Sequence, residues 1–189
     1  MTNSTAPVRF LRAADRPATA WRNGGGVTRE IAGRPAGAGL DDFRWRVSLA
    51  DVAAAGPFSA FPGVDRVITL VEGPGMALTV DGTEHVVDVP LRPFAFSGDA
   101  ATDCRLLGGP LVDFNVMTRR GLATADLVLA ELPRPVVVPA GATVLLVCLS
   151  GGAALDGTPL DRYDAALLTA PGVHELHPDG VTAVLTVRA

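Results

Sequence analysis

Apolar and polar side chains alternate along short segments of this chain, and glycine or proline separates one segment from the next. Residues 43–50 are the clearest case, because four apolar side chains share one face of an extended strand while Arg44, Arg46 and Ser48 share the other. With 21 glycines and 15 prolines in 189 residues, the pattern is typical of a β-sandwich or barrel of many short strands. Helix is expected only as a single turn at residues 51–55, so the predicted fold class is all-β. The predicted strands are residues 8–12, 28–32, 43–50, 67–71, 76–80, 84–89, 94–97, 103–107, 111–117, 127–131, 143–149, 165–169 and 182–188.

One arrangement of strands and turns occurs twice along the chain. Residues 67–83 and 144–158 each hold an apolar strand, a glycine turn, a second short apolar strand and a closing Asp-Gly-Thr hairpin. This order is typical of half of a small jelly-roll, so the sequence predicts a cupin-like double β-barrel, or bicupin. Residues 1–189 would form a single unit, with an N-terminal barrel at about residues 1–120 and a C-terminal barrel at 121–189. Because there are only two copies, a chance likeness between glycine-rich hairpins is the alternative.

The composition fits one compact globular protein and excludes several classes of partner. The chain is 48% hydrophobic and 19% charged with a formal net charge of −4, which offers no basic surface for nucleic acid or an anionic membrane. No apolar run approaches the ~20 residues that a membrane-spanning helix needs, and the first seven residues lack the pattern of a signal peptide. Cys104 and Cys148 lie in apolar segments and are expected to be reduced core residues. A cytoplasmic location is therefore expected, and a homodimer is left open.

All 16 basic residues are arginines, which restricts the chemistry that the chain can perform. Without lysine there is neither a Walker A phosphate loop nor a Schiff-base or general-base lysine. Anionic groups of a ligand must therefore be met by arginine, a helix terminus or backbone N–H groups.

No metal or other cofactor is expected. Metal-binding cupins use a His-x-His pair, because a two-residue spacing keeps both imidazoles on one face of a strand. The three histidines here are His85, His174 and His177, and the last two, three residues apart among glycine and proline, are expected in a surface loop. The chain also lacks a Gly-x-Ser-x-Gly nucleophile motif, so no catalytic residue is assigned.

The glycine triplet in residues 21–30 is the first block with candidate chemistry. Three consecutive glycines let the backbone approach a ligand or another strand, and an indole, a carboxamide, a hydroxyl, two guanidinium groups and a carboxylate surround them. This mixture suits a polar small molecule. A glycine-rich turn with solvated neighbours is the alternative.

Two later blocks add aromatic and polar residues. Residues 56–66 form a rigid loop whose phenylalanines either floor a pocket or plug a barrel end, and the adjacent Asp65 and Arg66 are interpreted as a structural ion pair. In residues 113–117, Asp113 and Asn115 share one face of an apolar strand. If buried, they need partners, and either an arginine or a ligand would serve.

With these blocks the sequence resembles the HutD/Ves family of small bicupins, which are often encoded with histidine-degradation enzymes. The likeness covers about the first 120 residues, while the second half matches mainly by its barrel pattern. The family commonly has lysine after the first tryptophan, where this chain has Arg22. The matching segments are Trp-Arg-Asn-Gly-Gly-Gly-Val-Thr-Arg-Glu-Ile at residues 21–31, Phe-Arg-Trp-Arg-Val-Ser-Leu-Ala at 43–50, Gly-Pro-Phe-Ser-Ala-Phe-Pro-Gly-Val-Asp-Arg at 56–66 and Asp-Phe-Asn-Val-Met at 113–117.

The resemblance implies a cytosolic protein that binds a small ligand and restrains histidine catabolism by sensing an intermediate such as urocanate or formylglutamate. It brings no established enzymatic activity. The residues agree in chemistry, because a small carboxylate needs the bidentate fork of arginine together with carboxamide or hydroxyl groups and an aromatic wall.

We therefore expect a site for a small carboxylate in the N-terminal half. Arg46 and Arg66 would clamp the carboxylate, and Glu30 would hold an arginine or accept a ligand N–H. Carboxamide and hydroxyl side chains would orient the ligand between aromatic walls. The expected ligand-binding residues are Trp21, Asn23, Thr28, Glu30, Arg46, Ser48, Ser59, Phe61, Arg66, Asn115 and Met117.

Two other functions compete with this interpretation. One is a metal-independent cupin enzyme, an isomerase or hydrolase with Glu30 or His85 as general base. A histidine or a carboxylate of raised pKa within the same site would favour it. The other is an interaction scaffold without a ligand, which predicts an exposed apolar patch and no polar concavity.

Overall fold

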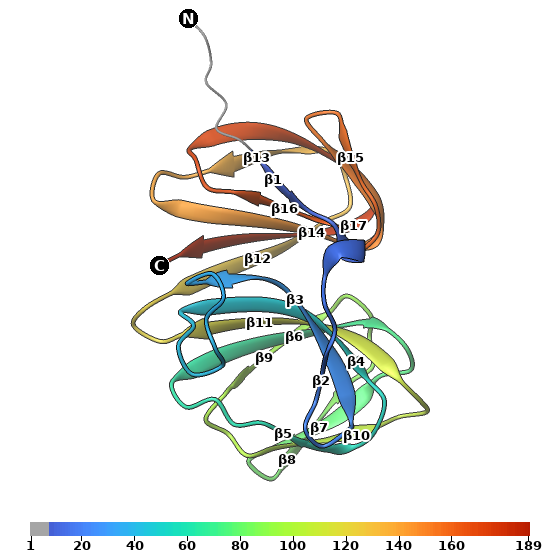
Figure 1. The fold of residues 1–189 in the computed structure, drawn as a ribbon. Helices are drawn as coiled ribbons and strands as arrows, with labels where there is room; N and C mark the ends of the chain where they lie inside the picture. Colours follow the sequence, from blue (N-terminus) through green and yellow to red (C-terminus); the bar gives the residue numbers. More distant parts are fainter. Residues whose placement is uncertain (1–7) are drawn as a thin grey trace, which may run out of the picture. The chain divides into compact units, whose positions relative to one another are not determined.

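The structure, a computed structural model, describes residues 8–189, and its strands group into two compact units. The N-terminal unit is Pro17–Ala123, and the C-terminal unit joins the segment up to Arg16 to Thr124–Ala189. Strand β1 (Arg9–Leu11) pairs with β16 (Ala165–Leu168), so the start of the described chain folds with its end (Figure 1).

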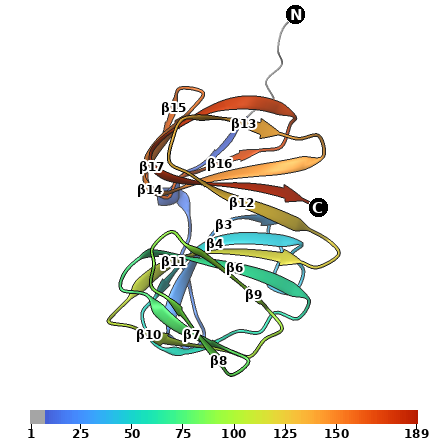
Figure 2. The same ribbon diagram turned by 180° about the vertical axis from the view of Figure 1, so that it is seen from behind.

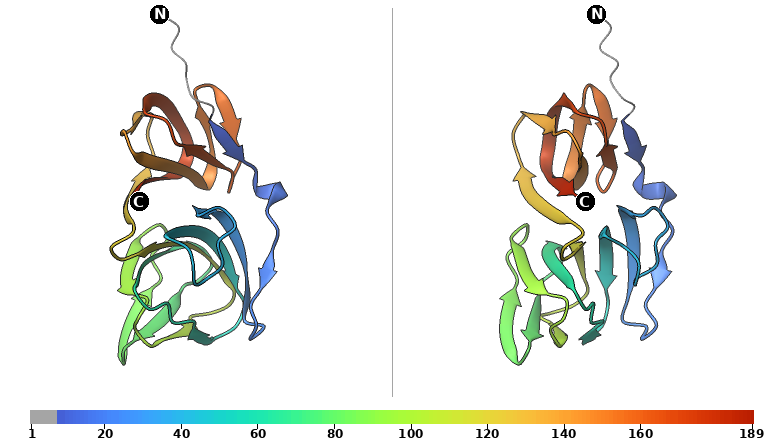
Figure 3. Two further views of the ribbon diagram at one scale, coloured as in Figure 1. Left: turned by 60° about the vertical axis from the view of Figure 1, so that its left-hand side comes forward. Right: turned by 90° about the vertical axis from the view of Figure 1, so that its left-hand side faces the viewer.

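Two antiparallel sheets form the N-terminal unit, and Figure 3 shows them from two further directions. The larger sheet has the order β2-β3-β4-β11-β6-β9 and the smaller sheet the order β5-β10-β7-β8. The larger sheet consists of β2 (Thr19–Ala20), β3 (Gly26–Arg34), β4 (Trp45–Val52), β11 (Leu111–Arg119), β6 (Val64–Glu72) and β9 (Pro93–Ser97). The smaller sheet consists of β5 (Gly56–Phe58), β10 (Thr102–Leu106), β7 (Met76–Val80) and β8 (Thr83–Val87).

Apolar side chains from both of these sheets pack into one cluster. Ile68 and Leu70 of the larger sheet belong to the same core as Met76 and Leu78 of the smaller sheet, and all four side chains are fully buried. Alternate residues of each strand face the opposite sheet, so the period-two pattern of the sequence produces this core. We call the face of the larger sheet that carries Ile68 and Leu70 the inner face.

The C-terminal unit is one seven-stranded sheet with the order β1-β16-β14-β17-β12, to which β13 and β15 add by pairing with β17 and β14. Its other elements are η1 (Ala13–Asp15), β12 (Thr124–Ala130), β13 (Arg134–Val138), β14 (Ala142–Leu155), β15 (Thr158–Leu160) and β17 (Gly172–Arg188), which can be followed in Figure 2. The core cluster of this unit is apolar, with Val144, Leu146, Leu155 and Leu176 fully buried.

The long strands β14 and β17 pair along almost their whole length, and the register shifts between Cys148 and Ser150. Just beyond the shift, Gly151 pairs with Gly180, at φ angles of +61° and +134°. A Cβ on Gly151 would lie 1.7 Å from the carbonyl oxygen of Asp179, and one on Gly180 would lie 2.1 Å from that of Ser150. Only glycine fits at this close approach.

The all-β jelly-roll prediction is confirmed, although backbone pairing leaves the sheets of residues 8–189 open rather than closed into barrels. Both predicted Asp-Gly hairpins are present: Asp81 and Gly82, and likewise Asp156 and Gly157, have positive φ, as a two-residue type I′ turn requires. The repeated motif is therefore closed in the same way in the two units.

Some local expectations are wrong. Residues 51–55 form no helical turn, because Asp51 and Val52 continue β4. The predicted turn at Gly151 and Gly152 is instead a continuous part of β14, where both glycines pair with β17 just after the register shift between Cys148 and Ser150. Strands β2, β5, β13 and β15 were not expected, being short or, in β5, β13 and β15, containing proline. Within residues 8–189, η1 is the only helical segment, and no helix there is long and apolar enough to cross a membrane.

We predict that Gly151→Ala destabilises the C-terminal unit far more than Gly141→Ala. Gly141 also has a positive φ, +74°, but nothing lies within 4 Å of a Cβ placed there, so only the backbone cost of about 1–2 kcal/mol applies. At Gly151 the overlap with Asp179 adds to that cost, giving roughly 3 kcal/mol or more. Urea unfolding followed by circular dichroism measures both variants. Equal losses would show that the strands separate freely at this point.

Candidate ligand-binding site

The strand register places seven of the expected site residues on the inner face of the larger sheet. Arg46 of β4 pairs with Met117 of β11, which pairs in turn with Arg66 of β6. Two residues along β4, Ser48 lies between Glu30 of β3 and Asn115 of β11. Directly paired residues of antiparallel strands point to the same side. Residues far apart in sequence, Thr28 among them, are thus aligned in rows on one face.

Arg66 is the most unusual of these residues, because its side chain is 6% exposed and, within residues 8–189, it makes neither a hydrogen bond nor an ion pair. Its guanidinium carbon instead lies 4.9 Å from the ring centre of Phe96, 5.4 Å from that of Phe58 and 5.5 Å from that of Phe61. These are cation–π distances. Burial lowers the pKa of Arg66 to about 10, against the effect of nearby Asp113, yet the guanidinium stays charged at neutral pH.

Two further buried polar groups on β11 lack partners. Asp113 is 2% exposed and Asn115 is 9% exposed, and the Oδ1 atom of each accepts no hydrogen bond from the described residues. Both lie on the inner face, since Asn115 pairs with Ser48 and Asp113 with Ala50. Burial raises the pKa of Asp113 to about 7, with the Arg66 charge opposing the shift and Asp51 adding to it. Asp113 can therefore hold or release a proton near neutral pH.

Arg46 lies at the more open end of the cluster. Its Nε donates to Oε2 of Glu30 at 2.7 Å, and the side chains of Arg46 and Glu30 are 14% and 39% exposed. Glu30 therefore orients one guanidinium, which leaves the remaining N–H groups of Arg46 free for another acceptor. The positive charge of Arg46 also acts on Arg66 and helps to lower its pKa, so the two guanidinium groups are electrostatically coupled.

The glycine triplet forms the turn between β2 and β3. Asn23 caps this turn by accepting a hydrogen bond from the backbone N–H of Gly25 at 3.0 Å. The carbonyl of Gly25 accepts from the N–H groups of Ala53 and Ala54. Gly26 approaches β4 so closely that a Cβ would lie 2.5 Å from the carbonyl oxygen of Asp51. The glycine triplet therefore allows β3 to approach β4 closely.

Trp21 packs beside this turn and is tied to the inner face. Its Nε1 donates to the hydroxyl of Thr28 at 2.7 Å, and its ring meets Phe58 edge-on at 6.1 Å. Trp21 is thus linked through Phe58 to the aromatic surroundings of Arg66.

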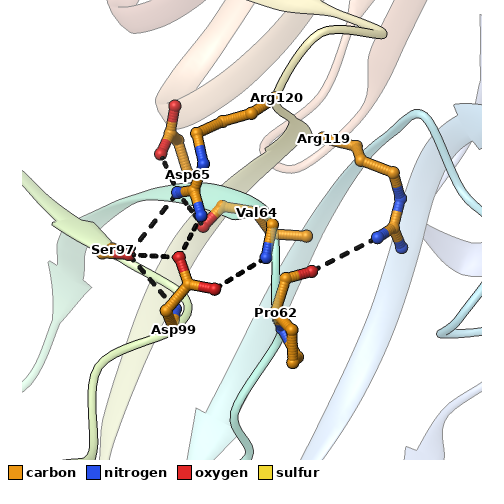
Figure 4. Close-up of polar contacts among 8 residues, drawn as sticks. Pro62, Val64, Asp65, Ser97, Asp99, Arg119 and Arg120 are labelled. Atoms are coloured by element: carbon orange, nitrogen blue, oxygen red, sulfur yellow. Dashed lines mark hydrogen bonds and ion pairs between the residues drawn. The ribbon is translucent and has the colours of Figure 1, made fainter.

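The loop before β6, which carries Phe61, is held by two arginines at the end of β11 (Figure 4). Arg119 donates to the carbonyl oxygens of Pro62, Phe43 and Asp41. Arg120 bonds both Asp65 and Asp99, and Asp99 accepts from the N–H of Gly63. These hydrogen bonds, together with those from Ser97, hold the pKa of Asp99 at about 2. They fix the loop that positions Phe61 over Arg66.

The ion pair expected between Asp65 and Arg66 is therefore wrong. Neighbouring residues on a strand point to opposite faces, so Asp65 points outward to Arg120 while Arg66 points inward. The burial of the two residues shows the same difference, Asp65 being exposed and Arg66 buried.

Not all of the expected residues join the cluster, and three of its members are outside the expected set. Asn23 and Ser59 are exposed, the first bound to its own turn and the second in the loop after β5. The three additional members are Asp113, Phe58 and Phe96. The sequence places Asp113 on one face with Asn115 and Phe58 in the loop with Phe61, whereas nothing in the sequence pairs Phe96 with Arg66.

The histidines lie elsewhere. The surface-loop prediction for His174 and His177 is wrong, since both lie on β17, where His174 is buried and its Nδ1 lies 2.6 Å from Oδ2 of Asp156. His85 packs against Phe94, with the ring centres 4.9 Å apart and the ring planes tilted by 41°. In residues 8–189, no group of three or more His, Cys, Asp or Glu side chains is placed to hold a metal ion. A surface hollow of about 380 Å³ is lined by residues 129–135 and contains none of the expected site residues.

These features define a small cupin-type jelly-roll protein with a charged, unpartnered polar cluster on the inner face of its N-terminal unit. A family model described as HutD matches residues 13–186. The chain belongs to the HutD family.

Known proteins agree with this assignment. The structure of HutD from Pseudomonas fluorescens SBW25, solved in a formate condition, is 35% identical, with a TM-score of 0.86 over 96% of this chain and 98% of that one. An uncharacterised 21.2 kDa protein in the hutC 3′ region of Pseudomonas putida is 48% identical over 110 residues. That match takes in 58% of this chain and 57% of the relative, so the chain spans little more than half the length of this curated relative. YhhW from Escherichia coli, at 12% identity and a TM-score of 0.70, shares the fold.

The raised pKa of Asp113 predicts a pH dependence of stability. An unfolded aspartate releases its proton near pH 3.8, whereas Asp113 in the folded protein holds its proton to about pH 7. The folded state then binds more protons between these values, so this group makes stability fall as pH rises from about 4 to 7, by up to about 1.4 kcal/mol per pH unit. Asp113→Asn should remove that slope and be the more stable form above pH 7.

Tryptophan fluorescence during urea unfolding at pH 5 and pH 8 is the measurement, because both tryptophans, Trp21 and Trp45, belong to the N-terminal unit. Other titrating groups affect both proteins alike, so the difference between them isolates Asp113. Parallel pH profiles for wild type and variant would contradict a buried, titrating Asp113.

Proposed function

We propose that the protein binds a small carboxylate on the inner face of its N-terminal unit and through this binding regulates histidine utilisation. Arg66 and Arg46 hold the carboxylate, and Asn115 and Ser48 orient the ligand. Met117 and the aromatic rings around Arg66 supply its apolar surroundings.

The observation that carries the proposal is the buried Arg66 guanidinium without an anionic partner. Burying an uncompensated charge is costly, and buried charges are almost always paired. Arginine presents its N–H groups in a fork that matches a carboxylate. A small carboxylate would supply the hydrogen-bonded anion that the described residues do not provide, since Asp113 acts on Arg66 through its charge alone.

The family supports the biological setting. The P. putida relative lies in the hutC 3′ region. The P. fluorescens HutD structure was solved in a formate condition. Formate is itself a carboxylate. Urocanate and formylglutamate, as carboxylate intermediates of histidine breakdown, are therefore the first ligands to test.

We predict that Arg66→Met raises the stability of the ligand-free N-terminal unit while abolishing its response to carboxylates. Methionine fills similar space without a charge to bury, so the gain should be on the order of 1–3 kcal/mol. In wild type, a ligand at 100 times its Kd should add about 2.7 kcal/mol. Thermal unfolding with and without urocanate, formylglutamate and formate, at pH 6, measures both effects.

Arg105→Met is the matched control. Arg105 belongs to the same unit, but it is exposed and pairs with Glu84 at 3.0 Å, so its removal should change neither stability nor the ligand response appreciably. Arg46→Ala should weaken binding, since it removes the second guanidinium. If wild type responded to none of the carboxylates, or if Arg66→Met kept the full response, the proposed site would be wrong. An interaction scaffold would then be favoured.

Asp113 favours one alternative function, a metal-independent enzyme. A buried carboxyl group with a pKa of about 7 has the protonation behaviour of a general acid or base working at neutral pH. This role would belong to Asp113 rather than to Glu30, which is bound to Arg46, or to His85, which packs against Phe94.

The enzyme alternative predicts turnover that Asp113→Asn removes while binding persists. Proton NMR of urocanate and formylglutamate incubated with the protein would detect new products. Unchanged substrate spectra alongside a clear thermal shift would favour binding without catalysis.

A further inference from the structure

We infer that the ligand of this site carries an N–H or O–H donor in addition to its carboxylate, and that the donor binds the orphaned oxygens of Asn115 and Asp113. The inference rests on the proposed carboxylate function and adds a second requirement to it. The ligand class then becomes hydroxy, amino, amido or imidazolyl carboxylates rather than simple carboxylates.

The acceptor oxygens of the site lie on β11. Oδ1 of Asn115 and Oδ1 of Asp113 are both buried and receive no hydrogen bond from residues 8–189. Buried polar atoms in native proteins are nearly always paired, so two unpaired acceptors on one strand face require an explanation. Since Asp113 and Asn115 are two residues apart on β11, their side chains stand side by side.

Residues 8–189 supply no hydrogen-bond donor to these oxygens. Arg66 is the cation that acts on Asp113 electrostatically, but it lies opposite Met117, four residues along β11, and donates no hydrogen bond to either oxygen. Arg46 also lies opposite Met117, and its Nε is bound to Glu30. Arg29 of β3 pairs with Leu49, on the opposite face of the sheet, and is bound to Asp51. The charged groups around Asp113 are thus either engaged elsewhere or out of register with its oxygen.

The site contains hydrogen-bond donors as well as acceptors. Arg66 offers N–H groups, and the nearby β11 face offers oxygens, so the site has cationic and acceptor parts close together. A molecule that satisfies both must present an anionic oxygen at one end and a hydrogen on nitrogen or oxygen at the other. Formate or acetate satisfies only the first part.

Matched pairs of carboxylates test this directly. Urocanate is compared with 3-(furan-3-yl)acrylate, which keeps the acrylate and a five-membered ring but has no N–H. Lactate is compared with propionate, which lacks the hydroxyl group. Isothermal titration calorimetry of the full chain should show that at least one donor-bearing member binds on the order of 10- to 100-fold more tightly than its partner.

Asn115→Leu locates the effect. It removes an acceptor at similar volume, so it should weaken the donor-bearing ligand and leave the donor-free one almost unchanged, which reduces the ratio within the pair. Arg105→Met is the control, since Arg105 is exposed and pairs with Glu84, and it should leave the ratio as in wild type.

Each result has a distinct meaning. Equal affinities within both pairs would overturn the inference while leaving carboxylate binding intact, and would mean that water occupies the acceptors. A ratio that persists in Asn115→Leu and also in Asp113→Leu would overturn the assignment to these oxygens. If no carboxylate binds at all, the proposed function fails, and the inference fails with it.

Discussion

The pairing of β11 with β4 on one side and β6 on the other is the constraint on which the site depends. This register places Met117 between Arg46 and Arg66, and Asn115 beside Ser48. Because side chains alternate between faces, a slip of one residue would turn every one of these polar groups outward. The apolar cluster that contains Ile68 and Leu70 opposes such a slip, because these side chains would leave the core. The same packing that stabilises the N-terminal unit therefore keeps two guanidinium groups on its inner face.

The N-terminal unit is built from two sheets and the C-terminal unit from one, and the two units also differ in the side chains that they bury. The inner face of the N-terminal unit carries Arg66, Asp113 and Asn115 among its apolar residues, whereas the core cluster of the C-terminal unit is made of aliphatic and other apolar side chains. The fold alone does not decide which polar groups are buried or where they lie. In this protein, the candidate site residues gather in the N-terminal unit.

The sequence patterns predict the strands and turns of this protein better than they predict its side-chain contacts. Alternation located most strands, and the Asp-Gly pairs located both hairpins, because these signals are local. The sequence does not show that Asp65 turns to Arg120, or that Phe96 covers Arg66, because strand pairing brings these residues together. The glycine triplet was the strongest local signal, yet it serves the approach of β3 to β4 at Gly26. Asn23 and Ser59 belong to informative motifs but lie outside the cluster, since a motif does not specify which of its side chains point inward.

An unpaired buried arginine affects more than recognition. The buried charge lowers the free energy of unfolding of the ligand-free protein. An anion that pairs with Arg66 raises that free energy again. In a cell, the fraction of unfolded chains available to proteases depends on that free energy. Such a protein would persist longer while its ligand is abundant and turn over faster once the ligand is consumed. The amount of protein, and not only its occupancy, would then follow the metabolite.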